Sequence, residues 1–325
     1  MPLEKLTLSD LPTLFVTPFG IAIGLLFGSF LNVVIHRLPR EESVVFPGSK
    51  CPSCGSPIAA RDNIPVLSWL LLRGRARCCG ARVSARYPLV ELMGGLLAAA
   101  VLQVLIYDLP PETPAWRAAA LFCIYLALGL GLLAATFIDL QYMILPDSIT
   151  IGGTVLGIVA APLRNFALTD ALLGAGFGFV LIFMPFIWLY ARIRGHSGMG
   201  LGDAKLAMLA GAWFGWQGAL FVLVAGAIQG TLLAIVVFIV RGRLDEPDAV
   251  QEEREQLQRH LQQLEGEEKQ QLLREIEHDP LASAPESGFG KARMAFGPFL
   301  ALATLEYLFV GPWMLDQYWQ WVWLA

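Results

Sequence analysis

The chain has 325 residues, of which 56% are hydrophobic and 15% are charged. A soluble domain carries about a quarter charged residues, and the mean hydropathy of this chain is +0.58. The composition therefore excludes an ordinary soluble domain and indicates a polytopic membrane protein. The formal net charge of −4 decides little, because the placement of charges along a membrane protein is what carries information.

Apolar runs long enough to cross the ~30 Å hydrocarbon core of a bilayer predict about eight transmembrane helices. The runs lie at residues 13–35, 88–107, 117–138, 149–163, 171–191, 204–216, 218–240 and 295–315. The first run is too long for the apolar segment of a secretory signal peptide, so we do not expect one. The predicted fold class is an all-α polytopic membrane protein.

The Lys and Arg residues gather on one side of this topology. With eight spans, that side holds the loops 36–87, 139–148, 192–203 and 241–294. These loops and their flanks contain all 23 Lys and Arg residues except Lys5, Arg117 and Arg164. Because cytosolic loops carry the excess of positive charge, we place this side in the cytosol and both termini on the outer side.

Polar segments divide the chain into five predicted parts. These are a first transmembrane helix (1–36), a cytosolic cysteine-rich loop (37–87), a transmembrane core (88–240), a cytosolic helical insertion with its linker (241–294), and a last transmembrane helix with an outer tail (295–325).

The insertion has an apolar stripe that slips near Gly266. The stripe consists of Val250, Leu257, Leu261, Leu264, Leu272 and Ile276. A helical hairpin turning at Gly266 and a single solvated helix both fit this pattern. We hypothesise that residues 247–278 recruit a partner or self-associate, although a passive solvated helix is equally consistent.

Six carboxylates fall within or beside the apolar runs. Asp147 and Asp170 each stand just before a helical run, where we predict that they serve as helix N-caps. Glu91 and Glu306 lie inside apolar runs, where we predict pairing with neighbouring helices. The remaining two need another explanation.

Those two are Asp139 and Asp203. Asp139 closes the run LGLGLLAATFID, at a helix end whose dipole disfavours a carboxylate. Asp203 follows Gly200 and Gly202, which would cap the next helix without a charge. Both lie at the predicted cytosolic rim on separate helices, so we expect one shared site. The two glycines would let the backbone approach an extended substrate and let Asp203 move toward its partner.

Such a pair of carboxyl groups is suited to hydrolysis, because like charges in contact share one proton. One carboxylate takes a proton from water while the other carboxyl group protonates the scissile carbonyl. A proton or cation relay in an ion-coupled transporter is the alternative. Transporter carboxylates lie near the bilayer midplane, often in repeated halves, and no repeat is visible here.

The segment GMGLGDAKLAMLAGAWFGW at 198–216 resembles the GxGD segment of type IV prepilin peptidases, which are intramembrane aspartic proteases. Further similar segments are GSFLNVVIHRLP at 28–39, the cysteine-rich stretch at 51–91, IDLQYMILPD at 138–147 and FGPFLALA at 296–303. The resemblance covers nearly the whole chain apart from about 244–290. It implies that Asp139 and Asp203 are the two catalytic aspartates.

The resemblance also implies a substrate and a location. The family cleaves the basic leader from type IV prepilins and type II secretion pseudopilins, at the cytosolic face of the bacterial inner membrane, and the substrate helix would enter from the bilayer. Both termini would then be periplasmic. Many members N-methylate the new terminal residue with S-adenosylmethionine, so we expect this methyl donor. We expect no nucleic-acid partner. A binding module with an inactive peptidase is a further rival, against which the intact aspartates argue.

Four cysteines lie in the first loop. Cys51 and Cys54, in CPSC, have the spacing of a zinc knuckle. The resemblance implies a second CxxC, but Ala76 stands at its first position, Cys79 fits its second, and Cys78 is extra. A four-thiolate zinc site that includes Cys78, three thiolates with water, and a loop without metal remain open. We favour structural zinc, because a cytosolic loop is kept reduced and is too small to build its own core.

Other side chains have simpler expected roles. Loop arginines would contact anionic lipid headgroups or, alternatively, a cofactor carboxylate, and Lys205 would contact headgroups. Cys123 is expected to be a small buried hydrophobe. Six tryptophans near the outer ends of spans are expected to be interfacial anchors. The arginines are Arg73, Arg75, Arg77, Arg82 and Arg86, and the tryptophans are Trp213, Trp216, Trp313, Trp319, Trp321 and Trp323.

Overall fold

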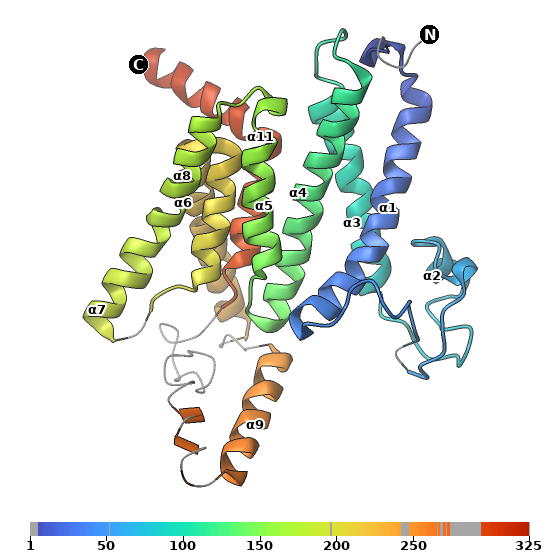
Figure 1. Cartoon of the computed structure of the whole chain (residues 1–325), viewed down its shortest axis with the longest axis vertical. Coiled ribbons are helices and arrows are strands. Elements are labelled where there is room, and N and C mark those ends of the chain that lie inside the picture. Colours follow the sequence, from blue (N-terminus) through green and yellow to red (C-terminus); the bar gives the residue numbers. More distant parts are fainter. Residues whose placement is uncertain are drawn as a thin grey trace. The chain divides into compact units, whose positions relative to one another are not determined.

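The computed structural model describes residues 6–51, 53–195, 197–241, 247–264 and 294–324, together with a few positions between 266 and 273. This part of the chain is built of helices and contains isolated β-bridges but no strand (Figure 1). The predicted all-α fold class is confirmed. Two compact units make up the chain, Met1–Ala134 with Pro162–Phe166 and Ala135–Ala161 with Ala167–Ala325.

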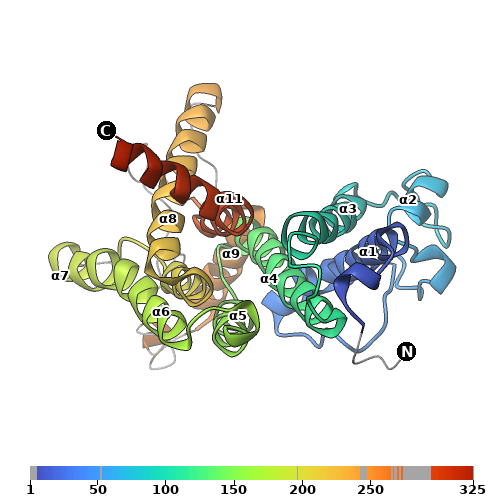
Figure 2. The same cartoon turned by 90° about the horizontal axis from the view of Figure 1, so that it is seen from above.

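The first unit is organised by two helices that lie side by side, α1 and α3 (Figure 2). Small residues let membrane helices approach closely, and here a Cβ at Gly24 would lie 2.4 Å from the carbonyl oxygen of Gly94. The loop between the two helices carries the cysteines. The helices of this unit are α1 (Thr13–Arg37), α2 (Leu67–Leu71), α3 (Arg86–Ala100, continued by a π-type helix to Ile106) and the first part of α4 (Ala115–Tyr142).

The second unit is organised around α8, which contacts α5, α6 and α11. Its contact with α6 is the closest, because a Cβ at Gly211 would lie 1.9 Å from the carbonyl oxygen of Gly174. The end of α4 also belongs to this unit. Its other helices are α5 (Asp147–Val159), α6 (Leu168–Ile182), α7 (Tyr190–Arg194), α8 (Leu201–Arg241), α9 (Asp248–Gln263) and α11 (Gly297–Leu324).

Helix α8 reverses direction at Gly215, whose φ of 72° and ψ of −170° are not helical. Tyr307 of α11 stacks near Phe214 before the reversal and near Phe221 after it, with ring centroids 4.9 and 5.2 Å away. Further along, a Cβ at Gly230 would meet the ring of Phe299. The second arm therefore returns along α11 toward its start, so the predicted runs 204–216 and 218–240 are the two arms of α8.

Five helices in the described part of the chain are long and apolar enough to cross a membrane. They are Thr13–Arg40, Arg86–Ile106, Ala115–Tyr142, Leu168–Arg194 and Leu201–Val240, and two shorter apolar helices are Asp147–Val159 and Gly297–Gly311. A polytopic membrane protein is confirmed. The count of eight crossings stays a prediction.

The insertion contains α9, which ends at Gln263, before Gly266 with its φ of 66°. An uninterrupted helix through residue 278 is therefore wrong. Val250 is buried, and Leu257, Leu261 and Leu264 are half-buried, so the apolar stripe does form one face. Ile276 and the linker at 280–290 lie outside the described residues.

Several smaller predictions are wrong. Asp147 is the first residue of α5 and Asp170 lies in the first turn of α6, and the helix starts after Pro146 and Ala167 have no side-chain cap. Both acids still stand at the favourable end of a helix dipole. Cys123 is exposed, not buried.

Trp213 is not an interfacial anchor. Its side chain is 1% exposed and its Nε1–H donates a 2.9 Å hydrogen bond to the carbonyl of Gly153 in α5. Trp216 and Trp313 are exposed, as anchors would be. The side chains of Trp319, Trp321 and Trp323 lie outside the described part.

Glu91 and Glu306 both pair across helices, as predicted. Glu91 accepts a 2.7 Å hydrogen bond from Ser29 of α1. Glu306 accepts a 2.6 Å hydrogen bond from the side-chain amide of Gln229 in α8. A buried polar group in an apolar helix needs such a partner.

Candidate active site and cysteine cluster

Asp139 lies in the last turn of α4 and is 5% exposed. Its Oδ2 accepts a 2.9 Å hydrogen bond from the backbone N–H of Gly297, the first residue of α11. The first N–H groups of a helix have no partner within that helix and carry its positive end. The helix that carries Asp139 offers this carboxylate no N-terminal donor, and α11 supplies one from a distant part of the chain.

Asp203 is the third residue of α8. Its Oδ2 accepts a 3.2 Å hydrogen bond from the N–H of Gly200, just before the helix. This contact is the backward half of a capping box, so the expectation that Asp203 has no capping role is also wrong. Gly200 binds the carboxylate directly, whereas Gly202 packs against Leu145, whose Cβ would lie 2.9 Å from a Cβ added there.

One side chain of the second unit, Leu145, links the segments that carry the hydrogen-bond donors of the two carboxyl groups. The Leu145 side chain lies against Gly202 and also 3.0 Å from a Cβ added at Gly297. Within the described residues, neither Oδ1 atom has a hydrogen-bond partner. Each carboxyl group is thus anchored through Oδ2.

Lys205 forms an ion pair with Asp147, through Nζ and Oδ1. The contact joins α8 to the start of α5, two residues after Asp203. Contact of Lys205 with lipid headgroups stays a prediction. The Asp147 side chain remains 60% exposed and that of Lys205 20% exposed, so the pair borders the site at the surface of the unit.

The four loop cysteines lie together in the first unit. Sγ of Cys51 lies 3.8 Å from that of Cys79, Sγ of Cys54 lies 3.4 Å from that of Cys78, and all four lie within 4.8 Å of one another. A tetrahedral zinc ion with Zn–S bonds of about 2.3 Å needs sulfur atoms about 3.8 Å apart. All four thiols are free, so the residues present fit a four-thiolate zinc site.

Two equivalent turns build this cluster. The N–H of Gly55 donates to the carbonyl of Cys51, and the N–H of Gly80 donates in the same way to Ala76, both at 2.8 Å. Ala76 thus occupies the place in the second turn that Cys51 holds in the first. Cys78 supplies the fourth sulfur from within that turn, and adjacency to Cys79 does not prevent both thiols from facing the cluster.

The thiols of the cluster differ in pKa. Hydrogen bonds from Ser56 lower the pKa of the Cys54 thiol to about 6. The hydrogen bond with Cys54 raises the pKa of the Cys78 thiol to about 12. Zinc binds thiolates, so a metal ion would have to displace the proton that these two sulfur atoms share.

Comparisons with known proteins match the N-terminal and the later part of the chain to separate family models. The family model "Bacterial Peptidase A24 N-terminal domain" matches residues 22–105, and "Type IV leader peptidase family" matches residues 126–235. A "Prepilin leader peptidase/N-methyltransferase" of Myxococcus xanthus is 37% identical over 95% of this chain and 95% of its own. The chain belongs to the type IV leader peptidase family.

Other family members with the same printed name come from Aeromonas hydrophila and Pseudomonas aeruginosa. The first is 40% identical over 67% of this chain and 80% of its own, and the second is 36% identical over 68% and 80%. No solved structure matches the chain. The leader peptidase match includes Asp139 and Asp203, and the N-terminal match includes all four clustered cysteines. The family gives no support to the transporter alternative.

Gly297 is the site residue that sequence reasoning missed. It lies outside both matched ranges and contributes only its main chain. A signal was present in FGPF, since Pro298 favours the first turn of a helix, where N–H groups are unpaired.

Proposed function

We propose that this chain is a membrane aspartic endopeptidase that cleaves the leader from type IV prepilins and related pseudopilins, with Asp139 and Asp203 as its catalytic pair. The observation that carries this assignment is that carboxyl groups of α4 and α8 are each held through Oδ2 by a main-chain N–H, with Leu145 packed against both donor segments. The family membership supports the reaction.

Cleavage needs one ionised and one protonated carboxyl group. The open Oδ1 atom of the ionised aspartate takes a proton from water as the water oxygen bonds to the scissile carbonyl carbon. The other aspartate gives its proton to the carbonyl oxygen. When the tetrahedral intermediate collapses, the aspartate that took the proton from water gives it to the leaving nitrogen as the C–N bond breaks. The other aspartate takes back a proton from a hydroxyl of the intermediate, so the pair again holds one proton. The donors from Gly297 and Gly200 hold each carboxyl group in place throughout.

The second proposed activity is N-methylation of the newly formed terminal amine, as the names of the relatives indicate. When bound, S-adenosylmethionine would supply an electrophilic methyl group on a sulfonium. The amine must be neutral to accept this group, so its ammonium form first gives one proton to water, and the N-methylated terminus is a cation. The substrate and the donor must therefore both reach a polar part of the protein.

Further proposals concern the surroundings of the site. Structural zinc bound by Cys51, Cys54, Cys78 and Cys79 would close the loop between α1 and α3. We place the protein in the bacterial inner membrane, with the aspartate pair at the cytosolic face and both termini in the periplasm. The five-part division of the chain, contacts with anionic lipids, and partner binding or self-association through 247–278 belong to the same proposal.

The test is cleavage of a prepilin peptide that includes the leader and the start of the mature helix, with and without S-adenosylmethionine. Mass spectrometry separates cutting from methyl transfer. We expect Asp139→Asn and Asp203→Asn each to lower cleavage by more than about a thousandfold, while Asp170→Asn, on the first turn of α6, retains it. Full cleavage by either of the first two variants would overturn the assignment of the pair.

A further inference from the structure

The first unit contains a cleft of about 870 Å³ that the peptidase reaction does not use. This volume lies within the range of small-molecule sites. The end of α1 contributes Asn32 and His36, and the start of α3 contributes Tyr87 and Glu91. The cysteine loop forms the remaining wall.

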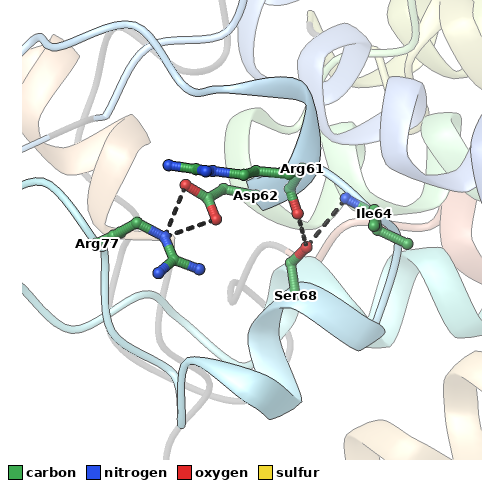
Figure 3. A network of polar contacts seen from close by, with 5 residues as sticks. All are labelled: Arg61, Asp62, Ile64, Ser68 and Arg77. Atoms are coloured by element: carbon green, nitrogen blue, oxygen red, sulfur yellow. Dashed lines mark hydrogen bonds and ion pairs between the residues drawn. The ribbon is translucent and has the colours of Figure 1, made fainter.

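The walls of the cleft are fixed by internal hydrogen bonds. The Oε1 and Oε2 atoms of Glu91 accept hydrogen bonds from Ser29 at 2.7 Å and from the N–H of Val66 at 2.6 Å, which ties the loop to both helices. The Ser68 hydroxyl accepts from the N–H of Ile64 and donates to the carbonyl of Arg61 (Figure 3). The cleft is therefore formed in advance of any ligand.

The Asp62–Arg77 ion pair holds the two parts of the loop together. Nε of Arg77 lies 2.8 and 3.1 Å from the two carboxylate oxygens of Asp62 (Figure 3). The Asp62 side chain is 13% exposed, so this pair is partly shielded from water. It joins the turn before α2 to the second cysteine turn, next to Cys78.

The lining carries unpaired charge of both signs. Lys50, Arg75 and Arg82 line the cleft, and the described part of the chain offers none of them an ion pair. Glu42 lines it with a carboxylate that is likewise in no ion pair. Two aromatic rings, Trp69 and Tyr87, complete the wall.

A lining with cations, a carboxylate and aromatic rings favours some classes of ligand over others. A phosphate headgroup needs cations but gains nothing from a carboxylate beside them, since like charges repel. A ligand that carries a carboxylate, a cationic centre and a flat ring would use every kind of group in this lining. An α-amino acid joined through a sulfonium to a nucleoside has this combination.

We propose that this cleft binds the methyl donor S-adenosylmethionine. The inference rests on the proposed function, because the N-methyltransferase activity needs such a donor. Lys50, Arg75 and Arg82 match the carboxylate of the donor, Glu42 matches its cationic groups, and the rings of Trp69 and Tyr87 match its base. Donor binding then belongs to the first unit and peptide cleavage to the second.

Binding itself is the primary readout. Zinc-loaded full-length protein in nanodiscs of phosphatidylcholine is titrated with labelled S-adenosylmethionine, and S-adenosylhomocysteine serves as competitor. We expect one saturable site per chain, at least tenfold weaker in Arg75→Gln/Arg82→Gln. Arg61→Gln/Arg73→Gln is the matched control, because it removes the same two charges from the same loop at positions that do not line the cleft.

The Glu42→Gln variant distinguishes binding of the donor from binding of a simple anion. The donor should bind this variant several-fold more weakly, whereas an anion would bind it more tightly. Unchanged or tighter donor binding by Glu42→Gln would overturn the inference. So would a double arginine variant whose only defect, seen after addition of phosphatidylglycerol, is in lipid association.

The methylated fraction of cleaved prepilin distinguishes this inference from the proposed function. A wild-type protein that cuts but neither binds the donor nor methylates contradicts the methyltransferase half of the proposed function. A wild-type protein that binds and methylates, while Arg75→Gln/Arg82→Gln methylates the same fraction, contradicts the placement of the donor in this cleft only.

Discussion

The backbone N–H of Gly297 donates a hydrogen bond to Oδ2 of Asp139 across 158 positions of the chain. The contact sets the start of α11 against the end of α4. A carboxylate at the end of α4 is disfavoured by the dipole of its own helix, and the positive end of α11 offsets that effect. The N-terminus of α11 thus stabilises the Asp139 carboxylate at the end of α4.

Replacing Gly297 should disturb this contact directly. A Cβ at this position would lie 2.6 Å from Oδ2 of Asp139 and 3.0 Å from Leu145, so Gly297→Ala must push the carboxyl group aside. A displacement of about 1 Å in a reacting group costs about 100-fold in rate, and we expect kcat/KM for prepilin cleavage to fall about 10- to 100-fold. Gly176→Ala is the control, since a Cβ there meets nothing within 4 Å. Equal activity of the two variants would refute a positioning role for Gly297.

The Asp147–Lys205 pair should act as a modest clamp between α5 and α8. Because Asp147 is 60% exposed, solvent screening limits the pair to less than about 1 kcal/mol. We expect Lys205→Met and Asp147→Asn each to lower Tm by a few degrees and to slow cleavage less than about fivefold. The double variant should be no worse than either single one. Additive losses of Tm would mean that the two side chains act separately.

The second cysteine turn makes a rescue experiment available. Wild-type protein should hold one zinc ion per chain by elemental analysis, and Cys78→Ser should lose it, because a structural site needs all four ligands. Adding Ala76→Cys to Cys78→Ser should restore the metal, since Ala76 has the place that Cys51 has in the first turn. Cys123→Ser should keep its zinc. Metal retained in Cys78→Ser alone would favour the site of three thiolates with water.

The contact between Gly211 of α8 and Gly174 of α6 should not accommodate a larger side chain. A Cβ at Gly211 would lie 1.9 Å from the main-chain oxygen of Gly174, and backbone cannot move aside as a flexible side chain can. Gly211→Val should therefore yield little monodisperse protein in detergent. Gly152→Val, where nothing lies within 4 Å, should purify normally. A stable Gly211→Val protein would show that α6 and α8 can separate without loss of the fold.

Sequence reasoning is strongest here where one residue contradicts its surroundings. Asp139 and Asp203 are charges in apolar runs, and burial of a charge is costly enough to nominate candidate site residues without any knowledge of the fold. The same cost explains why Glu91 and Glu306 were correctly expected to have partners on other helices. The apolar runs themselves predict the helices, because length and hydropathy suffice.

Sequence reasoning fails where the partner of a side chain comes from a distant part of the chain. Lys205 points to Asp147, 58 positions away, and no local spacing predicts that partner. A tryptophan can lie at a membrane interface or in a protein core. Trp213 lies in the core, where its Nε1–H finds the carbonyl of Gly153 as a partner. Ala76 interrupts the second CxxC pattern, and only the folded turn places the sulfur atom of Cys78 within the cluster.

Both candidate catalytic side chains owe their anchoring to amide hydrogens, at positions 200 and 297. Every amino acid except proline carries such a hydrogen, so the bond itself depends on where the chain turns into a helix, while glycine at 297 leaves the space that the Asp139 carboxyl group occupies. A search for catalytic helpers by exchange of polar side chains would overlook both positions.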